Sequence, residues 1–530
     1  MRAEEQSEVL LSQTPAPVSW EHEVQEIEAR RKRALRMGGE QAVERQHAKG
    51  KWDVRKRLYN LLDAGSFEEI GGLTGVADES QGELGSSFIP SNVVTGIGQI
   101  NARDVAVAAD DYTVGHGTPN EASSAKRTHI EELASELRMP LIRIVDMAGA
   151  SLKSIEDRGY TMLPGAKWDW LSILSQVPVV SIASGPSPGL GAWRVAASHF
   201  SVQVKGIGQV FAAGPPIVAA GMNQILTAEE LGGSDVHAGH SGVVDNLAMD
   251  EADALQQAQR FLSYLPPSVH DLPSRLSTLD DPNRREDSLL TAIPRNVRKV
   301  YNSRRIFNAV FDQDSVFEIG RNWGRSSVVG FARLDGYPVG FIGNDPKFYG
   351  GGMDDAAAEK LTRHIDLCDT FHLPVVNLAD QPGTLIGLEA EKRGTIRRGL
   401  RVLAAVEQAS IPWYTVVVRR LFGVGGAAYG PSRRLDNRIA WPSARWGPMP
   451  IEGGVDALYK SDIEQAVDPD ARRRELEEQF AALGSPLRTA ERFGINDVID
   501  PRDTRPILCR WVRRAYGTLE AGVRERTVRP

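Results

Sequence analysis

The sequence predicts an α/β protein in which one domain occurs twice in tandem, through an internal duplication. Two apolar, strand-like runs, IVDMAG at 144–149 and LADQPG at 378–383, place Asp146 and Asp380 234 positions apart. Glycine and proline restrict or release the backbone at fixed points, so their recurrence at one offset indicates a repeated fold. The same offset joins Gly96 to Gly330, Asp111 to Asp345, Pro140 to Pro374, Gly149 to Gly383, Pro178 to Pro412 and Gly189 to Gly423.

The elements around these aspartates repeat as well. Residues 123–139 and 354–371 carry apolar side chains at helical spacing, and each segment precedes one of the aspartate-bearing strands. A second strand follows in each half, at 177–184 and 413–420, and runs into a glycine-rich turn. This alternation of helices and strands implies parallel strand pairing with crossover helices.

Three segments are expected along the chain. Residues 1–50 form an N-terminal charged helical arm, which includes the run EHEVQEIEARRKRALRM at 21–37. Residues 51–290 form the first copy of the domain, and residues 291–530 form the second. The stretch Leu265–Arg298 is rich in Pro, Asp, Ser and Arg and has no long apolar period, so it is the predicted linker.

Composition disfavours several classes of protein. The 530 residues carry a formal charge of −7, which argues against a nucleic-acid binder held by phosphate contacts. Two cysteines, Cys368 and Cys509, are too few for a disulfide framework or a zinc ribbon. The N-terminal segment lacks the apolar run of a signal peptide, and the apolar stretch near 211–222 is too short to span a bilayer. We therefore expect a cytoplasmic protein that binds neither nucleic acid nor membrane.

Two glycine-rich turns, GPSPGLGAW at 185–193 and FGVGGAAYG at 422–430, are the candidate sites of chemistry. A turn from a parallel strand into a helix exposes backbone N–H groups, which can hold an anion or a developing oxyanion. For either turn alone, the alternative is a glycine turn needed only for tight packing. GVGGAA also fits a dinucleotide fingerprint, but Asp436 and Glu452 are poorly placed as its acid, so nicotinamide binding is disfavoured.

Other motifs point away from metal and ATP chemistry. His237 and His240 have the spacing of metal ligands in a loop, but such loop histidines are more often structural, so no metal is expected on this chain. The sequence contains neither the glycine-rich phosphate loop of ATPases nor the GxSxG elbow of serine hydrolases.

Five long motifs extend over the chain from Gln46 towards the C-terminal region. They are QHAKGKWDVRKRLYNLLDAGSFEEIGGL at 46–73, LTAEELGGSDVHAGHSGVVD at 226–245, RRIFNAVFDQDSVFEI at 304–319, VVGFARLDGYPVGFIGND at 328–345 and AWPSARWGPMPIEGGVDALY at 440–459. Together they resemble the carboxyltransferase β subunits of propionyl-CoA, acetyl-CoA and methylcrotonyl-CoA carboxylases. The resemblance implies two tandem crotonase-like (ClpP/crotonase) β-β-α superhelix domains, in agreement with the duplication.

The resemblance also implies an enzyme of the ligase or transferase class that moves a carboxyl group from carboxybiotin to the α-carbon of an acyl-CoA. Biotin would arrive on a partner, the biotin carboxylase or biotin carboxyl carrier (α) subunit, because this chain has no AMKM biotin-acceptor motif. The coenzyme A thioester would lie mainly on the N-terminal half and biotin on the C-terminal half. The family forms homo-oligomers, usually hexamers built as trimers of dimers.

Family motifs assign the site residues by position. Each turn would supply one oxyanion hole, with the thioester oxygen expected at the first and the ureido oxygen of biotin at the second. The expected catalytic residues are Gly189, Leu190, Gly423, Val424 and Gly425, the substrate-binding residues are Ala148, Gly149, Ala150 and Gly185, and the biotin-binding residues are Gly383 and Thr384.

The chain departs from the family near the expected acyl site. DMAGAS at 146–151 stands where the family commonly has DSGGAR, and GPSPGL at 185–190 replaces GPCAGG, which introduces Pro188 and Leu190. Thr384 replaces the family's phenylalanine. Three functions stay open: a carboxyltransferase with an altered acyl substrate, a non-catalytic assembly subunit, and a decarboxylase or other crotonase-type enzyme. A hydratase is disfavoured because it needs paired glutamates, and Glu156 is the only nearby glutamate in the first half.

Overall fold

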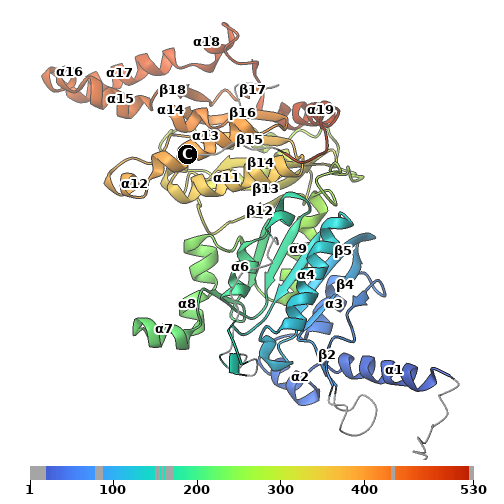
Figure 1. Cartoon of the computed structure of the whole chain (residues 1–530). Helices are drawn as coiled ribbons and strands as arrows, with labels where there is room; N and C mark the ends of the chain where they lie inside the picture. Colours follow the sequence, from blue (N-terminus) through green and yellow to red (C-terminus); the bar gives the residue numbers. More distant parts are fainter. Residues whose placement is uncertain are drawn as a thin grey trace, which may run out of the picture.

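The protein, a computed structural model, is described over residues 19–77, 88–149, 152, 155–156, 159–161, 171–430 and 436–524. Each half of the chain builds one large mixed sheet with helices packed around it, and the N-terminal half lies below the C-terminal half in Figure 1. The predicted α/β class and the tandem duplication are confirmed. None of the helices in these ranges is long and apolar enough to cross a membrane.

The sheet of the N-terminal half has the strand order β1-β4-β5-β6-β7-β9-β11. β1, β4 and β5 pair antiparallel, and every later neighbour pairs parallel. The central strands are buried along their whole length, as in parallel sheets that are covered on both faces. The strands are β1 (Glu68–Ile70), β4 (Val93–Ile100), β5 (Arg103–Asp110), β6 (Leu141–Val145), β7 (Val179–Ala183), β9 (Phe200–Val204) and β11 (Asn246–Ala248).

The sheet of the C-terminal half repeats this order as β12-β13-β14-β15-β16-β17-β19, and β18 pairs with the end of β16. The hairpin β13–β14 and the parallel neighbours that follow it match their N-terminal counterparts. The strands are β12 (Phe317–Ile319), β13 (Ser327–Leu334), β14 (Tyr337–Asn344), β15 (Val375–Gln381), β16 (Trp413–Phe422), β17 (Asp436–Ala440), β18 (Arg445–Gly447) and β19 (Asp497–Val498). Small two-stranded sheets are formed by β2 (Gly75–Val76) with β3 (Ile89–Pro90), and by β8 (Pro186–Pro188) with β10 (Gln209–Phe211).

The repeat has more than one offset. β4 and β13, β5 and β14, and the helices α4 (Glu121–Glu136) and α11 (Asp355–Thr370) are all 234 positions apart. Before them, α3 (Val54–Leu61) and α10 (Ser303–Val310) are 249 apart, because the first half holds about 15 extra residues around β2 and β3. A repeated ion pair confirms this second register: Arg55 pairs with Glu69 at 2.6 Å, and Arg304 pairs with Glu318 at 2.6 Å.

The remaining helices surround the two sheets and extend to the edges of the molecule (Figure 1). In the N-terminal half they are α1 (Glu21–Leu35), α2 (Glu40–His47), α6 (Leu190–Ala196), α7 (Pro215–Met222), α8 (Ala228–Gly232) and α9 (Glu251–Tyr264). In the C-terminal half they are α12 (Leu388–Lys392), α13 (Thr395–Gln408), α14 (Gly423–Ala427), α15 (Ile451–Leu458), α16 (Lys460–Gln465), α17 (Pro469–Leu483), α18 (Pro486–Ala490) and α19 (Thr504–Tyr516). Short helical turns are η1 (Gly115–Gly117), η2 (Ser172–Ser175), η3 (Asp235–Ser241), η4 (Asp287–Thr291), η5 (Tyr349–Gly351) and η6 (Pro501–Asp503).

A shared aromatic core joins the two halves. Phe261 on α9 stacks on Phe200 of β9, with ring centroids 4.8 Å apart, and also meets Phe331 of β13 at 5.6 Å. Phe317 of β12 meets Phe200 edge to face at 5.5 Å. Because these rings are buried between both sheets, the hydrophobic effect holds the halves together as one packed unit.

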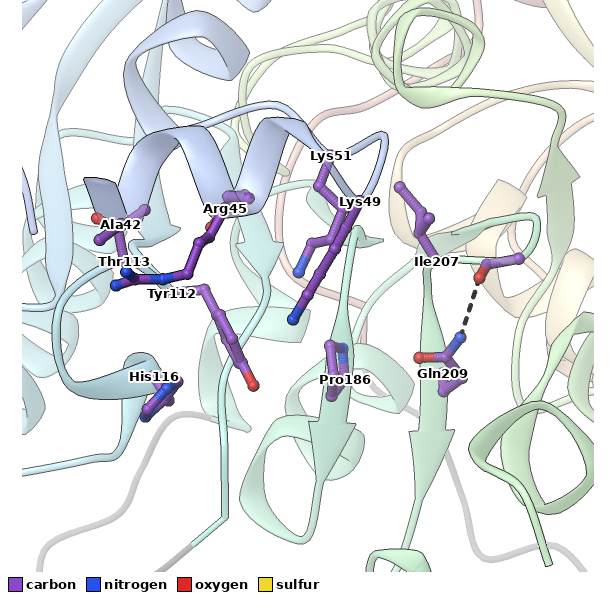
Figure 2. Close-up of a pocket in the computed structure, with 12 residues that line it drawn as sticks. Ala42, Arg45, Lys49, Lys51, Tyr112, Thr113, His116, Pro186, Ile207 and Gln209 are labelled. Atoms are coloured by element: carbon purple, nitrogen blue, oxygen red, sulfur yellow. Dashed lines mark hydrogen bonds between the residues drawn. The ribbon is translucent and has the colours of Figure 1, made fainter. Parts of the chain in front are cut away.

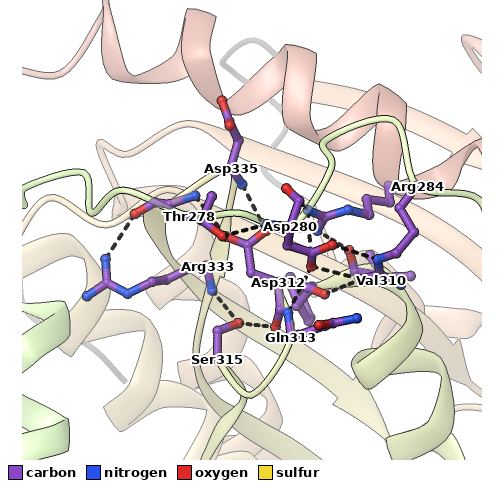
Figure 3. A network of polar contacts seen from close by, with 12 residues as sticks. Thr278, Asp280, Arg284, Val310, Asp312, Gln313, Ser315, Arg333 and Asp335 are labelled. Carbon is purple, nitrogen blue, oxygen red and sulfur yellow. Dashed lines mark hydrogen bonds and ion pairs between the residues drawn. The ribbon is translucent and has the colours of Figure 1, made fainter.

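The predicted linker is clamped to the C-terminal half by a polar network (Figure 3). Asp280 pairs with Arg284 at 2.8 Å and accepts the backbone N–H of Gln313 at 2.9 Å. Arg505 on α19 pairs with Asp280 at 3.3 Å and with Asp312 at 2.8 Å, and only 1% of its surface is exposed. The linker has no apolar period, and its charged residues fix its course by ion pairs.

Replacing Arg505 by glutamine should lower the free energy of unfolding by about 3 kcal/mol, because Asp312 then stays buried without a cation and Asp280 keeps only Arg284. Urea unfolding followed by tryptophan fluorescence measures the loss. Arg502→Gln is the matched control, because its partners Asp287 and Asp500 are 87% and 30% exposed and exposed pairs add little. Equal losses in the two variants would show that the buried network does not carry this stability.

Candidate functional site

The first glycine-rich turn lies between β8 and α6. Gly189 has a φ of 54°, a left-handed conformation that favours glycine, and its N–H donates to the carbonyl of Phe211 at 3.0 Å. Leu190 is the first helical residue, so its N–H has no acceptor within the helix. Trp193, one turn further on α6, is 67% exposed. The turn therefore presents backbone donors beside an exposed aromatic side chain.

The second turn lies between β16 and α14 and repeats this geometry. Gly423 has a φ of 63°, and Val424 after it is 75% exposed. Gly425 approaches the loop after β15 so closely that an added Cβ would lie 3.0 Å from the nitrogen of Thr384 and 3.1 Å from the carbonyl carbon of Gly383. The structure thus brings together Gly383, Thr384 and Gly425, which the sequence assigned to one site.

The loop after β6 packs on the first turn in the corresponding way. An added Cβ on Gly149 would lie 3.4 Å from Cγ of Pro188, so this glycine faces the turn. The N–H of Ala148 donates to the carbonyl of His116 at 2.8 Å and is already engaged. Ala150 lies outside the described residues.

Gly185 is buried below the first turn, against the ion pair between Lys51 and Asp146. An added Cβ would lie 1.8 Å from Oδ1 of Asp146 and 2.8 Å from Nζ of Lys51. Only glycine leaves room for these charges, so its clearest role in the structure is to admit the ion pair.

A buried aspartate supports each turn. Asp146 directly follows β6, is fully buried, and pairs with Lys51 at 2.6 Å and with Arg57 at 2.9 Å. Arg57 also pairs with Glu251 on α9 at 2.5 Å. The backbone N–H of Asp146 donates to the carboxylate of Asp110 at 3.2 Å. Burial lowers the pKa of the Lys51 ammonium, while the charge of Asp146 opposes that shift.

Asp380 takes the same position in the C-terminal half with different partners. It is fully buried, pairs with Arg420 at 2.6 Å and accepts the hydroxyl of Tyr301 at 2.9 Å. Its backbone N–H donates to the side-chain oxygen of Asn344 at 3.0 Å, which is the position of Asp110 in the repeat. Burial, reinforced by Asp380, raises the pKa of Tyr301 well above its usual value, so this hydroxyl stays protonated and donates.

A basic cleft of about 400 Å³ opens beside the first turn (Figure 2). Arg45, Lys49 and Lys51 supply its positive charges, and none of the described residues that line it is acidic. Pro186 of β8 lies in its wall, so the cleft and the turn share one strand. These three cations lie in the basic run RQHAKGK at 45–51, which no sequence motif marks as a site.

The two loop histidines contact backbone carbonyls and a hydroxyl near them. One ring nitrogen of His237 contacts the carbonyl of Val210 at 2.5 Å, and the other contacts the hydroxyl of Ser241 at 2.9 Å. A ring nitrogen of His240 contacts the carbonyl of Asp235 at 2.8 Å. Within the described ranges, no group of three His, Cys, Asp or Glu side chains has the arrangement of a metal site.

Comparison with known proteins gives a consistent family. The family model described as "Carboxyl transferase domain" matches residues 45–519. The carboxyltransferase subunit of propionyl-CoA carboxylase from Haloferax mediterranei is 34% identical over 92% of this chain and 95% of the relative. Methylmalonyl-CoA decarboxylase subunit alpha from Veillonella parvula is 33% identical over 88% and 91%. The crystal structure of the transcarboxylase 12S hexamer, with methylmalonyl-coenzyme A and methylmalonic acid bound, superimposes with a TM-score of 0.84 at 30% identity over 98% of both chains.

Gly185→Ala should destabilise the folded chain, because the new methyl group displaces either Asp146 or Lys51 from their buried pair. We expect a loss of about 3 kcal/mol, the usual cost of breaking such a pair, measured by urea unfolding. Gly239→Ala is the control, since an added Cβ there meets no heavy atom within 4 Å. An unchanged stability of the Gly185 variant would contradict the packing role of this glycine.

Proposed function

The chain belongs to the carboxyl transferase family, and from that premise we propose that it transfers a carboxyl group between biotin and the α-carbon of an acyl-CoA. The observation that carries the proposal is the pair of glycine turns at equivalent places in the two halves, each with backbone donors and a buried aspartate below it. Biotin comes on a partner α subunit, and the homo-oligomer is a hexamer like the transcarboxylase relative. We place the activity in the cytoplasm, where the unpaired thiols of Cys368 and Cys509 stay reduced.

Each turn stabilises one developing negative charge. The backbone N–H of Leu190, next to Gly189, donates to the thioester oxygen as the α-proton leaves, and the N–H groups at Val424–Gly425 donate to the ureido oxygen as the carboxyl group departs. Carboxybiotin supplies the carboxyl group, and its ureido nitrogen supplies the base for the α-proton. Preorganised donors of this kind typically contribute about 3 kcal/mol each to lowering the barrier. Gly383 and Thr384 form the wall of the biotin side, and Gly149 forms the wall of the acyl side.

The basic cleft suits the phosphates of coenzyme A. Lys49 and Arg45 add positive charge at its wall, whereas the charge of Lys51 is already balanced by the buried Asp146. Phosphate groups bind favourably where cations have no competing acid, and the described lining of this cleft contains none. A coenzyme A bound there has its pantetheine arm directed along β8 towards Gly189.

Decarboxylation of a carboxyacyl-CoA is the second candidate function. The specific observation in its favour is the similarity to the Veillonella methylmalonyl-CoA decarboxylase subunit, which matches as fully as the carboxylase relatives do. The same two turns serve both directions, because the enolate and the ureido anion arise in either one. Pro188 and Leu190 at the first turn then determine which acyl group fits. A non-catalytic assembly role is the remaining alternative.

The deciding experiment is biotin-dependent decarboxylation by the purified chain, with malonyl-, methylmalonyl- and bulkier carboxyacyl-CoAs and free biotin. We expect turnover that requires biotin and ranks the acyl groups. Gly425→Ala pushes the second turn away from Gly383 and Thr384, so its kcat should fall by about tenfold or more, while Gly239→Ala keeps full activity. No turnover by the wild-type chain with any substrate, while a control carboxyltransferase works, favours the assembly role.

Lys49→Gln should raise KM for the acyl-CoA by about fivefold at low salt, the effect of losing one exposed phosphate contact of about 1 kcal/mol. The steady-state assay above measures it, and the KM for free biotin should not change. A carboxyacyl-pantetheine, which lacks the nucleotide phosphates, serves as the control substrate. If the variant loses as much with pantetheine as with the CoA ester, Lys49 does not read the phosphates.

A further inference from the structure

The C-terminal half contains a second basic cleft, with a volume of about 570 Å³. The clamped linker contributes Arg295 and Arg298 to its wall, β16 contributes Arg420 and Phe422, and β18 contributes Arg445. None of the described residues that line it is acidic. Ile293, Trp441 and Ile451 add apolar surface between the guanidinium groups.

This cleft is the counterpart of the first one in the internal repeat. Gln46 and Lys49 line the first cleft, and Arg295 and Arg298 line the second at the same positions, since 295 − 46 and 298 − 49 both equal 249. The floors correspond too: Gln209 pairs with Pro186 in the β10–β8 ladder, and Arg445 pairs with Arg420 in the β18–β16 ladder. The two clefts therefore occupy equivalent places in the repeat, and more arginines line the second.

Three of these arginines carry uncompensated charge. Arg295 and Arg298 are exposed and Arg445 is half-buried, and within the described part of the chain none of the three forms an ion pair. Arg420 differs, because Asp380 already binds its guanidinium at 2.6 Å. Guanidinium groups favour planar anions such as carboxylates and phosphates, so the cleft is built to attract an acidic ligand.

The position of the cleft at the second turn indicates the chemical class of its ligand. Phe422 lines the cleft and immediately precedes Gly423, so a ligand seated there lies at the entrance to the second turn. Both substrates of the proposed reaction reach their turn on a long arm. The arm of coenzyme A is rooted in phosphates, whereas the arm of biotin is rooted in a protein, whose anionic groups are the carboxylates of aspartate and glutamate.

We propose that Arg295, Arg298 and Arg445 form a docking cleft for an acidic surface next to the biotinylated lysine of the carrier protein. The proposal rests on the function proposed above and names the partner chemistry that the second half recognises. The first cleft reads the phosphates at the root of one arm, and the second reads carboxylates at the root of the other. Docking of the carrier raises the effective concentration of the biotin ring at Gly423–Gly425.

Two synthetic biotinyl-lysine peptides test this, one with glutamates around the lysine and one with serines and glutamines. In the biotin-dependent decarboxylation assay, the acidic peptide should have a KM about tenfold lower than the neutral peptide at low salt. The advantage should shrink as salt is added, because exposed charges are screened. The triple variant R295Q/R298Q/R445Q should lose the advantage and keep wild-type kinetics with free biotin and with the acyl-CoA. Arg138→Gln, an exposed arginine at the end of α4 in the other half, is the matched control and should behave as wild type.

Several results would overturn the proposal. An acidic peptide that performs no better than the neutral one, or an advantage that survives the triple substitution, removes the cleft from carrier docking. Inhibition by excess coenzyme A that the triple variant relieves assigns the cleft to a second nucleotide instead. Absence of turnover even with free biotin refutes the proposed function separately, and the anisotropy of a fluorescent acidic peptide, bound by wild type and not by the triple variant, still decides the docking.

Discussion

Each half of this protein is organised around one buried carboxylate at the end of a central parallel strand. Asp146 and Asp380 are both fully buried. The backbone N–H of each donates to the side chain of the last residue of the neighbouring strand, Asp110 or Asn344. An unpaired charge at such a depth would cost several kcal/mol, so the surrounding chain must deliver a cation or a hydroxyl to it. That requirement fixes the course of the chain just before α3 in the first half and just before α10 in the second. It also leaves room only for glycine at position 185.

The two halves meet this requirement differently. In the first half the counter-charges come from Lys51, which precedes α3, and from Arg57, which lies within α3. In the second half Arg420 comes from the strand itself, and Tyr301 adds a hydroxyl. The duplicated scaffold therefore supports two similar turns with different ion pairs.

The shared aromatic core joins the two halves into one rigid unit. Phe261 of α9 packs against strands of both sheets, so the halves cannot rotate independently without exposing buried rings. The linker cannot slide either, because Arg505 binds Asp280 within it and Arg284 of the linker donates to the carbonyls of Ala309 and Phe311.

The sequence by itself determined the fold class, the duplication and the two turns, because glycine, proline and apolar periodicity act locally and leave a readable pattern. It also placed Gly383, Thr384 and Gly425 in one site, through the resemblance of their motifs. It detected only the offset of 234, and the earlier register of 249 became visible once Arg55–Glu69 and Arg304–Glu318 were seen as equivalent pairs. Gly185 was expected to touch substrate. In the structure it lies against the ion pair of Lys51 and Asp146, two residues that are 95 positions apart in the sequence.

Only the tertiary structure decided where the charges gather. Lys49 and Gln209, or Arg298 and Arg445, belong to distant segments that strand pairing brings to one cleft, and no local pattern encodes such a meeting. The charged linker looked like an unstructured connection because its order comes from ion pairs with α19, and ion pairs leave no periodicity. Local backbone preference is written in neighbouring residues, whereas a binding surface is set by which segments the folded core forces together.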